Sequence, residues 1–513
     1  MNFILQISTK IKKKMSTKQE FGSIRGRIFP IHKSELRKFL PMASIFILIS
    51  FCYALTRSLK DMNMLKDANN TAIYWLKAVA ITPSMILFTI IYGKVSRSTG
   101  RDGRFNTVMI YFLCFFAFSL LFLLPNKESL QLTGLSKMLI EKYPSLTGLW
   151  QAICYWPISL FYIHAEAWGT FALSVVFWTF VNEITGVKQA KRFYSFLSMF
   201  AALGSICAGL ILKLDSVSKN FDQGLKFVIT GIVLILVIYN YFTADIKANP
   251  AYYQVEAKQK KVKVKMSFME SMGFLAKSKY LMLVSILVIG YGLVIALFEA
   301  VQKAQVQEYV QKTGDNAIYA GIYSEQQIAV GIVSILVTLF FATPILKRGW
   351  RFAASATPAT ALVMTILFFT FLRFGSTLDG FLQSYHMTAL HMSVIVGIYN
   401  VVLIKSVKYV LFDPTKEAVY IPLDEETKVR GKAAVDGVGS RLGKSLASVL
   451  VTLMATTFGG GDVANIRTPI VLIIIAVIIC WFMAVQTLGK LKAAAEEKHE
   501  SEHREASKIQ ASK

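Results

Sequence analysis

Long apolar stretches separated by short polar segments run through most of the chain. A helix needs about 20 mostly apolar residues to cross the hydrocarbon core of a bilayer, and we count twelve stretches of this kind. They cover residues 38–60, 73–93, 105–124, 149–181, 193–213, 225–244, 280–302, 318–343, 352–374, 385–412, 435–457 and 468–489. The fourth and the tenth are long enough to be tilted or bent. The pattern predicts an all-α membrane protein with twelve transmembrane helices.

The composition agrees with this pattern and excludes other classes of protein. Of the 513 residues, 54% are hydrophobic and 17% are charged, and the mean hydropathy is +0.49. Soluble domains average about 45–50% apolar and about 25% charged residues, so we exclude an ordinary cytosolic enzyme and a disordered chain. The five cysteines stand singly in apolar stretches, which gives no sign of a disulfide framework or a zinc site.

The net charge of +25 is concentrated between the spans rather than in a separate domain. Loops after even-numbered spans are rich in Lys and Arg, and loops after odd-numbered spans are poorer, with a mixed-charge exception after the third span. Basic loops tend to stay in the cytoplasm, so we expect both termini to be cytoplasmic. We interpret the basic middle loop, at about 245–279, as a topology signal that lies on anionic lipid, and we expect no nucleic-acid partner, because no folded soluble domain would present this charge.

The chain divides into two similar halves. A basic segment at 1–37 precedes a six-helix half at 38–244, and a basic linker at 245–279 leads to a second half at 280–489 and a charged tail at 490–513.

A short repeat supports this division. The loop between the fourth and fifth spans of each half carries a similar heptapeptide, Asn-Glu-Ile-Thr-Gly-Val-Lys at 182–188 and Asp-Glu-Glu-Thr-Lys-Val-Arg at 424–430, an offset of 242 residues. Parallel six-helix halves with a midplane site between them describe the major facilitator architecture, which is the fold that we expect.

Charged side chains interrupt the apolar spans, where they are costly. A charge at a helix centre costs about 2.5–3.5 kcal/mol on insertion scales, so such groups usually face a cavity or a partner. Arg57 and Glu299 are 242 residues apart and therefore hold related positions in the two halves. The candidates for a central binding site are Arg57, Lys60, Glu166, Glu299, Lys303, Asp436, Arg441 and Lys444, with Tyr53 on the stripe of Arg57 as a base-stacking candidate. An excess of cations suits a phosphate chain.

Simpler interpretations compete for several of these residues. Snorkelling to the headgroups is the alternative for Lys60 and Lys303, and also for Lys405, a charge that interrupts the tenth span. A structural ion pair is the alternative for Glu166. Glu299 and Lys303 lie one helical turn apart, where a pair on an exposed helix is worth only about 0.2–0.5 kcal/mol. We expect Lys303 to lie nearer the outer interface and to attract nucleotide there.

One segment resembles a nucleotide-hydrolysis motif but does not have its spacing. The segment from Gly439 to Ser445 resembles a phosphate-binding loop, but only three residues separate Gly439 from Gly443 where that loop needs four. We interpret these glycines as sites of close helix approach. The sequence offers neither a catalytic Ser/His/Asp or Cys/His set nor a metal-ligand spacing, so we expect a transporter that uses no cofactor and no metal.

Five segments carry a family resemblance: Ala-Glu-Ala-Trp-Gly at 165–169, Phe-Trp-Thr-Phe-Val-Asn-Glu-Ile-Thr at 177–185, Ala-Lys-Arg-Phe-Tyr at 190–194, Leu-Phe-Asp-Pro-Thr-Lys-Glu-Ala-Val-Tyr-Ile-Pro-Leu-Asp at 411–424 and Lys-Val-Arg-Gly-Lys-Ala-Ala-Val-Asp at 428–436. With them, residues 36 to 488 resemble the nucleotide transporter (ATP:ADP antiporter) family of obligate intracellular bacteria and plastids, above all its chlamydial members.

The resemblance implies exchange of external ATP for internal ADP, without hydrolysis, across a bacterial inner membrane. Lys60, Glu166 and Glu299 match charged transport residues of the family. Lys444 is our choice for its C-terminal lysine, and Lys432 and Lys416 are the alternatives. Phosphate is a candidate further substrate, and we expect a monomer. The alternative function within the family is a proton-coupled importer of nucleoside triphosphates or NAD.

Overall fold

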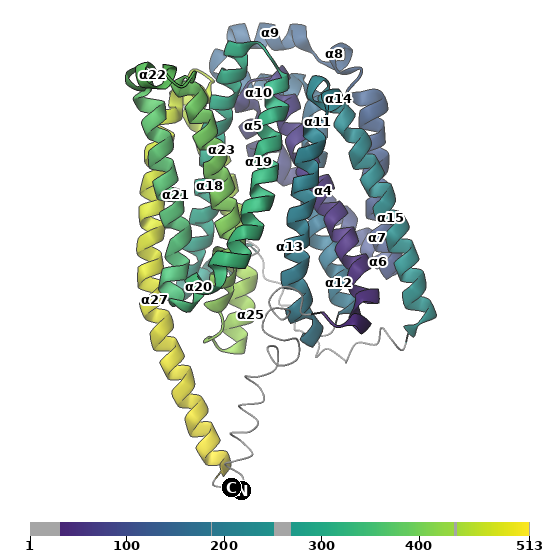
Figure 1. Ribbon diagram of the computed structural model, residues 1–513, viewed down its shortest axis with the longest axis vertical. Helices are drawn as coiled ribbons and strands as arrows, with labels where there is room; N and C mark the ends of the chain where they lie inside the picture. The colour runs from purple at the N-terminus through teal and green to yellow at the C-terminus, as the bar shows by residue number, and fades with distance from the viewer. Residues whose placement is uncertain (1–30, 186, 251–267, 436–438, 512–513) are drawn as a thin grey trace.

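The protein is a bundle of long, roughly parallel helices (Figure 1). The computed structural model describes residues 31–185, 187–250, 268–435 and 439–511, and the secondary structure of these residues is helical throughout. Ten of the helices are long and apolar enough to cross a membrane. Two shorter apolar helices, Met199–Leu212 and Leu442–Thr457, fall on the predicted fifth and eleventh spans. The expected all-α architecture is confirmed, with ten to twelve apolar helices among the described residues.

The spans of the first half are often built from more than one element. They are α4 (Leu36–Asp67), α5 with η2 and α6 (Asn70–Trp75, Leu76–Ile81, Thr82–Ser98), α7 with η3 (Arg101–Phe118, Ser119–Leu123), α11 with η5 and α12 (Trp156–Trp168, Gly169–Phe177, Trp178–Ile184), α13 (Val187–Leu212) and α15 (Gly224–Ala248). The segments η2, η3 and η5 are π-helical.

The second half repeats this plan. Its spans are α18 (Lys279–Thr313), α19 with η7 and α20 (Ala317–Leu336, Val337–Phe341, Ala342–Lys347), α21 (Trp350–Arg373), α23 with η8 and α24 (Ala389–Val407, Lys408–Phe412, Asp413–Ala418), α26 (Ser440–Thr457) and α27 (Arg467–Ala511). The segments η7 and η8 are again π-helical.

Short helices mark the two faces of the bundle (Figure 1). We call the face with α8 (Lys127–Leu130), α9 (Thr133–Lys142), α14 (Asp215–Lys219) and α22 (Gly375–Gln383) the loop face. The opposite face, where α4 begins and α27 ends and where α25 (Glu425–Ala434) lies, is the terminal face. Helix α17 (Phe268–Lys277) precedes α18 and packs on it.

The long fourth stretch predicted at 149–181 is two elements. Helix α10 (Thr147–Cys154) packs against α5 and α9, and the span itself starts at Trp156. Pro157 explains the break, because proline has no backbone N–H to continue a helix but fits the first helical turn.

The first helix of each half crosses the fifth helix at a glycine. A Cβ atom on Gly204 would lie 2.6 Å from the carbonyl oxygen of Ile47, and one on Gly443 would lie 2.4 Å from that of Ile289. Ile47 and Ile289 are 242 residues apart, so the two crossings are equivalent. The packing interpretation of Gly443 is confirmed, since any side chain would force the helices apart.

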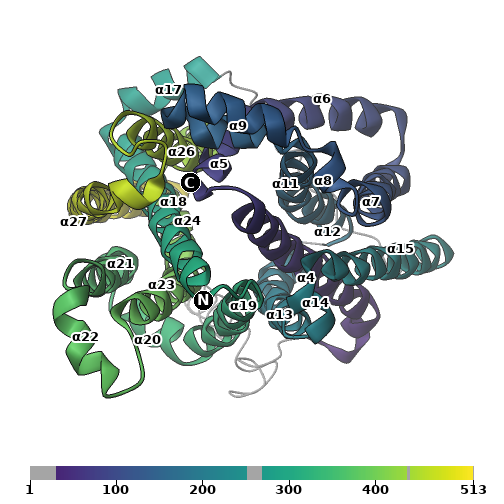
Figure 2. The same ribbon diagram turned by 90° about the horizontal axis from the view of Figure 1, so that it is seen from above.

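The halves meet along two equivalent interfaces. Helix α13 packs along α19, and α26 packs against α5 and η2, so the fifth span of one half meets the second span of the other in both cases. Seen from above, the elements of the first half and those of the second lie on opposite sides of the bundle (Figure 2). Helices α4 and α18 approach each other between them and carry the charged residues described next.

Candidate functional site

An ion pair joins the two halves through α4 and α18. Nη2 of Arg57 lies 2.6 Å from Oε1 of Glu299. Nζ of Lys405, on α23, lies 2.9 Å from the same oxygen. Glu299 therefore neutralises one cation from each half, and only 12% of its side chain is exposed.

A second ion pair joins the halves one helical turn away. Nζ of Lys303 lies 2.8 Å from Oδ2 of Asp61. The other oxygen of Asp61 accepts a hydrogen bond from the Tyr162 hydroxyl at 3.0 Å and lies 3.2 Å from Nζ of Lys60. Asp61, Lys60 and Lys303 are almost fully buried. Burying charges is tolerated only when they are paired and hydrogen-bonded, and Asp61 meets this condition with three partners.

Lys60 links this pair to the fourth span. Its Nζ lies 2.8 Å from Oε1 of Glu166 and 3.6 Å from the centre of the Tyr162 ring. The Lys60 side chain is 3% exposed, whereas that of Glu166 is 33% exposed. Glu166 is thus the side of this contact that water or a ligand reaches.

These residues form one cluster of charge between the halves. We call it the central charge cluster and define it as Arg57, Lys60, Asp61, Lys77, Glu166, Glu299, Lys303 and Lys405. Lys77, in η2, acts electrostatically on all three carboxylates. Counting these eight described residues, five cations face three carboxylates, a net charge of +2.

Direct contacts between the halves seal the cluster from the loop face. Nε2 of Gln307 donates hydrogen bonds to the carbonyl oxygens of Leu65 at 3.0 Å and Ala68 at 2.8 Å. Its Oε1 accepts from the backbone N–H of Asn70 at 3.1 Å. Leu65 and Gln307 are again 242 residues apart. Further along, the N–H of Val463 donates to Oγ1 of Thr71 at 3.3 Å.

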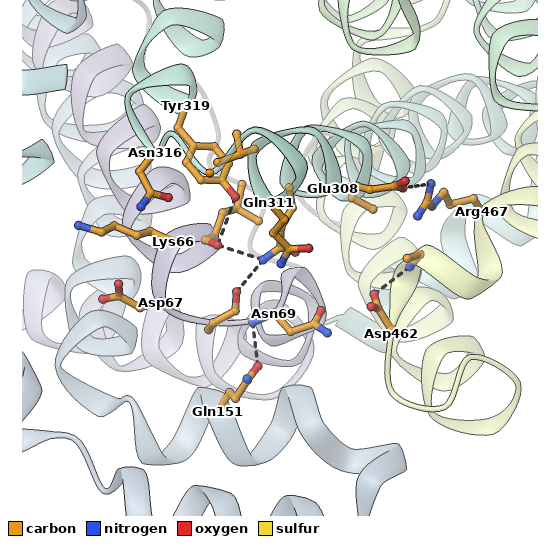
Figure 3. Close-up of a pocket in the computed structure, with 17 residues that line it drawn as sticks. Lys66, Asp67, Asn69, Gln151, Glu308, Gln311, Asn316, Tyr319, Asp462 and Arg467 are labelled. Carbon is orange, nitrogen blue, oxygen red and sulfur yellow. Dashed lines mark hydrogen bonds and ion pairs between the residues drawn. The ribbon is translucent and has the colours of Figure 1, made fainter. Parts of the chain in front are cut away.

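A cavity of about 570 Å³ borders this seal, since Leu65, Ala68 and Gln307 are among the residues that line it. Figure 3 shows this cavity and the polar residues around it. Its wall includes polar residues of both halves, among them Asp67, Asn69, Glu308 and Arg467. Nη1 of Arg467 lies 2.7 Å from Oε2 of Glu308. We call this space the outer cavity.

A cavity of only about 10 Å³ lies inside the central charge cluster, lined by Arg57, Asp61, Glu299 and Lys303 among others. This is room for about one water molecule. The two cavities share no lining residue. In this conformation the cations between α4 and α18 are therefore closed onto their own carboxylates.

The structure brings together five of the residues predicted from sequence. They are Arg57, Lys60, Glu166, Glu299 and Lys303. Arg57 and Glu299 do hold equivalent positions and face each other directly. The prediction that any of them binds substrate stays a prediction.

Lys303 is not where we expected it. It does not reach the outer interface but is 4% exposed and paired with Asp61. Nor do Glu299 and Lys303 pair with each other within the described residues: Glu299 turns to Arg57 and Lys405. Lys303 faces across the bundle because its carboxylate partner, Asp61, holds the equivalent position in the other half. Lys405 likewise pairs inside the protein rather than snorkelling to the surface.

The remaining predicted residues lie apart from these pairs. Lys444 is exposed on α26 and forms no ion pair with a described residue. Asp436 lies outside the described residues, and the side chain of Arg441 is not described. Tyr53 is half-buried, and its ring occupies the space beside Gly169, where a Cβ atom would lie only 2.4 Å from it.

Two alternatives to Lys444 lie near one carboxylate. Nζ of Lys416 is 3.6 Å from Oε1 of Glu417, and Lys432 pairs with the same side chain.

Sequence reasoning missed three members of the cluster as site residues: Asp61, Lys77 and Lys405, the last of which was noted only as a charge in the tenth span. Asp61 carries the cross-half pair to Lys303, and the 242-residue offset between them was the signal that could have found it. Lys77 was the lone cation inside the second apolar stretch, a position that itself indicates a function.

Comparison with known proteins identifies relatives over most of the chain. A family model described as TLC ATP/ADP transporter matches residues 14–491. The chain is 33% identical to ADP,ATP carrier protein 1 of Chlamydia trachomatis, covering 96% of this chain and 95% of that protein. It is 32% identical to ADP,ATP carrier protein 1 of Rickettsia prowazekii, covering 91% and 96%.

Solved structures share the fold. A bacterial homologue of the iron transporter ferroportin, in its inward-facing state, superposes with a TM-score of 0.52 at 13% identity, covering 89% of this chain and 98% of that one. A bacterial metal transporter gives 0.50 at 11% identity, with the same coverage. These likenesses support the major facilitator-like arrangement of the helices.

Proposed function

We propose, from the premise that the chain belongs to the TLC ATP/ADP transporter family, that it imports external ATP in exchange for internal ADP. The chain is a multi-pass membrane protein and a nucleotide transporter, not an enzyme. To this the proposal adds the direction of transport, the obligatory exchange of ATP for ADP and the residues responsible for both.

The central charge cluster is the observation that carries this proposal. Lys60, Lys303 and Arg57 are each held by a carboxylate at 2.6–2.8 Å. Phosphate oxygens are ligands of the same kind for these cations: Lys offers a point charge and Arg a bidentate fork. A phosphate chain that enters the cluster takes over cations that Glu166, Asp61 and Glu299 hold when it is empty.

Exchange of partners in the cluster couples binding to movement of the halves. Two of its pairs, Arg57–Glu299 and Asp61–Lys303, cross from one half to the other and hold them together. A ligand shifts a conformational equilibrium only by its different affinity for the two states. A nucleotide that releases these cross-half pairs favours reorientation, whereas the empty carrier keeps them and reorients slowly. This difference makes transport an exchange.

The orientation of the two faces in the membrane is part of this proposal, and the distribution of basic loops supports it. We place the loop face outside, where the outer cavity receives ATP, and the terminal face in the cytoplasm, in agreement with the basic loops. In this conformation the seal separates the outer cavity from the cluster, while Arg57 and Glu166 keep exposed fractions of 28% and 33%.

Release of preloaded nucleotide tests the proposal. Purified protein in vesicles loaded with labelled ADP should release the label when ATP or ADP is added outside, and should retain it when AMP, adenosine or buffer is added. Release without external nucleotide would indicate a channel or a uniporter. Release that depends on a proton gradient instead would support the proton-coupled importer.

A further inference from the structure

The second span turns a polar stripe toward the central charge cluster. Asn70, Tyr74 and Lys77 follow one another at intervals of four and three residues, which places them on one face of a helix. Nδ2 of Asn70 donates to the carbonyl oxygen of Ala300 on α18 at 3.0 Å, so this face points at the other half. Tyr74 is fully buried.

Two polar atoms of this stripe have unused hydrogen-bonding capacity. The Tyr74 hydroxyl and Oδ1 of Asn70 are buried, and neither has a hydrogen-bond partner among the residues that the structure describes. Buried polar atoms usually have a partner, because leaving one without a partner is costly. Two such atoms on the helix face that carries Lys77 are available to a ligand or a water molecule.

Lys77 is the cation of the cluster without a carboxylate. The four others each lie within 2.6–2.9 Å of a carboxylate oxygen. No described carboxylate lies within ion-pairing distance of Lys77, and its ammonium instead lies 5.3 Å from the centre of the Tyr74 ring. The side chain is half-buried. A half-buried cation that forms no ion pair with a described carboxylate is available to an incoming anion without first breaking an ion pair.

The backbone at Lys77 is unusual as well. Lys77 is the second residue of the π-helical segment Leu76–Ile81, which packs against α26 of the other half. π-helical turns are rare and occur often at functional sites.

We propose that Lys77, together with the hydroxyl of Tyr74 on the same helix face, is a further substrate-binding group that takes a phosphate oxygen. The inference rests on the proposed function and deepens it. The phosphate group belongs either to the nucleotide or to free inorganic phosphate, because both present the same oxygens. Lys77 forms the first contact, since it has no internal partner to release, and the paired lysines follow as their carboxylates withdraw.

The experiment compares binding to purified protein for four variants and the parent. Lys77→Gln removes the charge, Lys77→Arg retains it, and Tyr74→Phe keeps the ring and removes only the hydroxyl. Lys94→Gln, an exposed lysine near the end of the same span, is the matched control. Calorimetry measures the affinity for ATP, ADP, AMP and inorganic phosphate, and circular dichroism checks the fold.

We expect Lys77→Gln to lose about tenfold to hundredfold in affinity for ATP and ADP, the range for a hydrogen bond to a charged group. Lys77→Arg should recover part of the loss, and Tyr74→Phe should show a smaller loss. Lys94→Gln should bind like the parent. Loss of inorganic phosphate binding with unchanged nucleotide affinity would identify free phosphate as the ligand and equally support the site.

Unchanged affinities for both nucleotide and phosphate in folded Lys77→Gln would overturn the inference and leave the proposed function standing. A loss in Lys77→Gln with normal binding in Tyr74→Phe would still support the lysine but remove the hydroxyl from the site. A parent that binds neither ATP, ADP nor phosphate would overturn both the inference and the proposed function.

Discussion

Arg57 and Glu299 occupy equivalent positions in the two halves, 242 residues apart, and contact each other at 2.6 Å. The same offset relates Asp61 to Lys303, which lie 2.8 Å apart with the charges reversed. Residues related by a pseudo-twofold axis meet only on that axis, so α4 and α18 cross there. Each half supplies one cation and one anion here, so the charges of one half complement those of the other.

Glu299→Gln should abolish most exchange while the protein remains inserted. The amide cannot neutralise Arg57 and Lys405, and removing one partner of a buried pair costs about 3–5 kcal/mol. We expect a loss of about hundredfold or more in the rate of ATP/ADP exchange. Glu141→Gln, which changes an exposed carboxylate on α9, is the control and should exchange normally. Exchange near the parent rate in Glu299→Gln would show that the Arg57–Glu299 pair only supports the structure and is not needed for transport.

Asp61→Asn and Lys303→Gln should damage the protein less together than the sum of their single effects. Each single change leaves a buried charge without its cross-half partner, and the double change removes both charges. We expect a coupling free energy of about 0.5–3 kcal/mol, as for residues in direct contact. Thermal unfolding in detergent measures it. Strict additivity would show that the 2.8 Å contact contributes nothing to the stability of the protein.

Lys60→Gln should lose affinity for ATP and ADP alike, because both carry the phosphates that we expect Lys60 to bind. Lys444→Gln should lose less, and its loss should shrink at high salt, because exposed charges are screened. Lys432→Gln should change neither the ATP affinity nor the ADP affinity, since exposed ion pairs such as Lys432–Glu417 are worth about 0–1 kcal/mol. A binding titration at two ionic strengths decides between them. Normal ADP binding by Lys60→Gln would return that residue to a structural role.

A disulfide across the loop face should stop transport reversibly. Thr71 and Val463 belong to different halves and are joined by a hydrogen bond of 3.3 Å. We expect Thr71→Cys/Val463→Cys, in a background without the five native cysteines, to lose exchange under oxidant and to regain it under reductant. Each single cysteine variant should be unaffected. Full exchange with the disulfide formed would mean that the seal need not open.

The fold followed from sequence because its signals are local or repetitive. Apolar length identifies the spans, and the heptapeptide repeat relates the halves. The break before Trp156 was visible only as Pro157 in an otherwise continuous apolar stretch. The π segments have no such signal, since they depend on contacts between helices rather than on residue type.

The site was harder to predict because its pairs are tertiary. Arg57 and Glu299 could be related through the repeat, but nothing in the sequence shows that Glu299 also meets Lys405. The prediction for Lys303 was wrong for a physical reason. Its position along the helix indicates only its depth in the membrane, whereas its burial depends on the carboxylate of Asp61 on the facing helix.

The most direct test of the account is uptake of labelled ATP into vesicles that contain ADP or no nucleotide, with and without a proton uncoupler. The account predicts rapid uptake into ADP-loaded vesicles, little uptake into empty ones and no effect of the uncoupler, because a nucleotide must release the cross-half pairs on every passage. Equal uptake into empty and loaded vesicles, or uptake that the uncoupler abolishes, would contradict it.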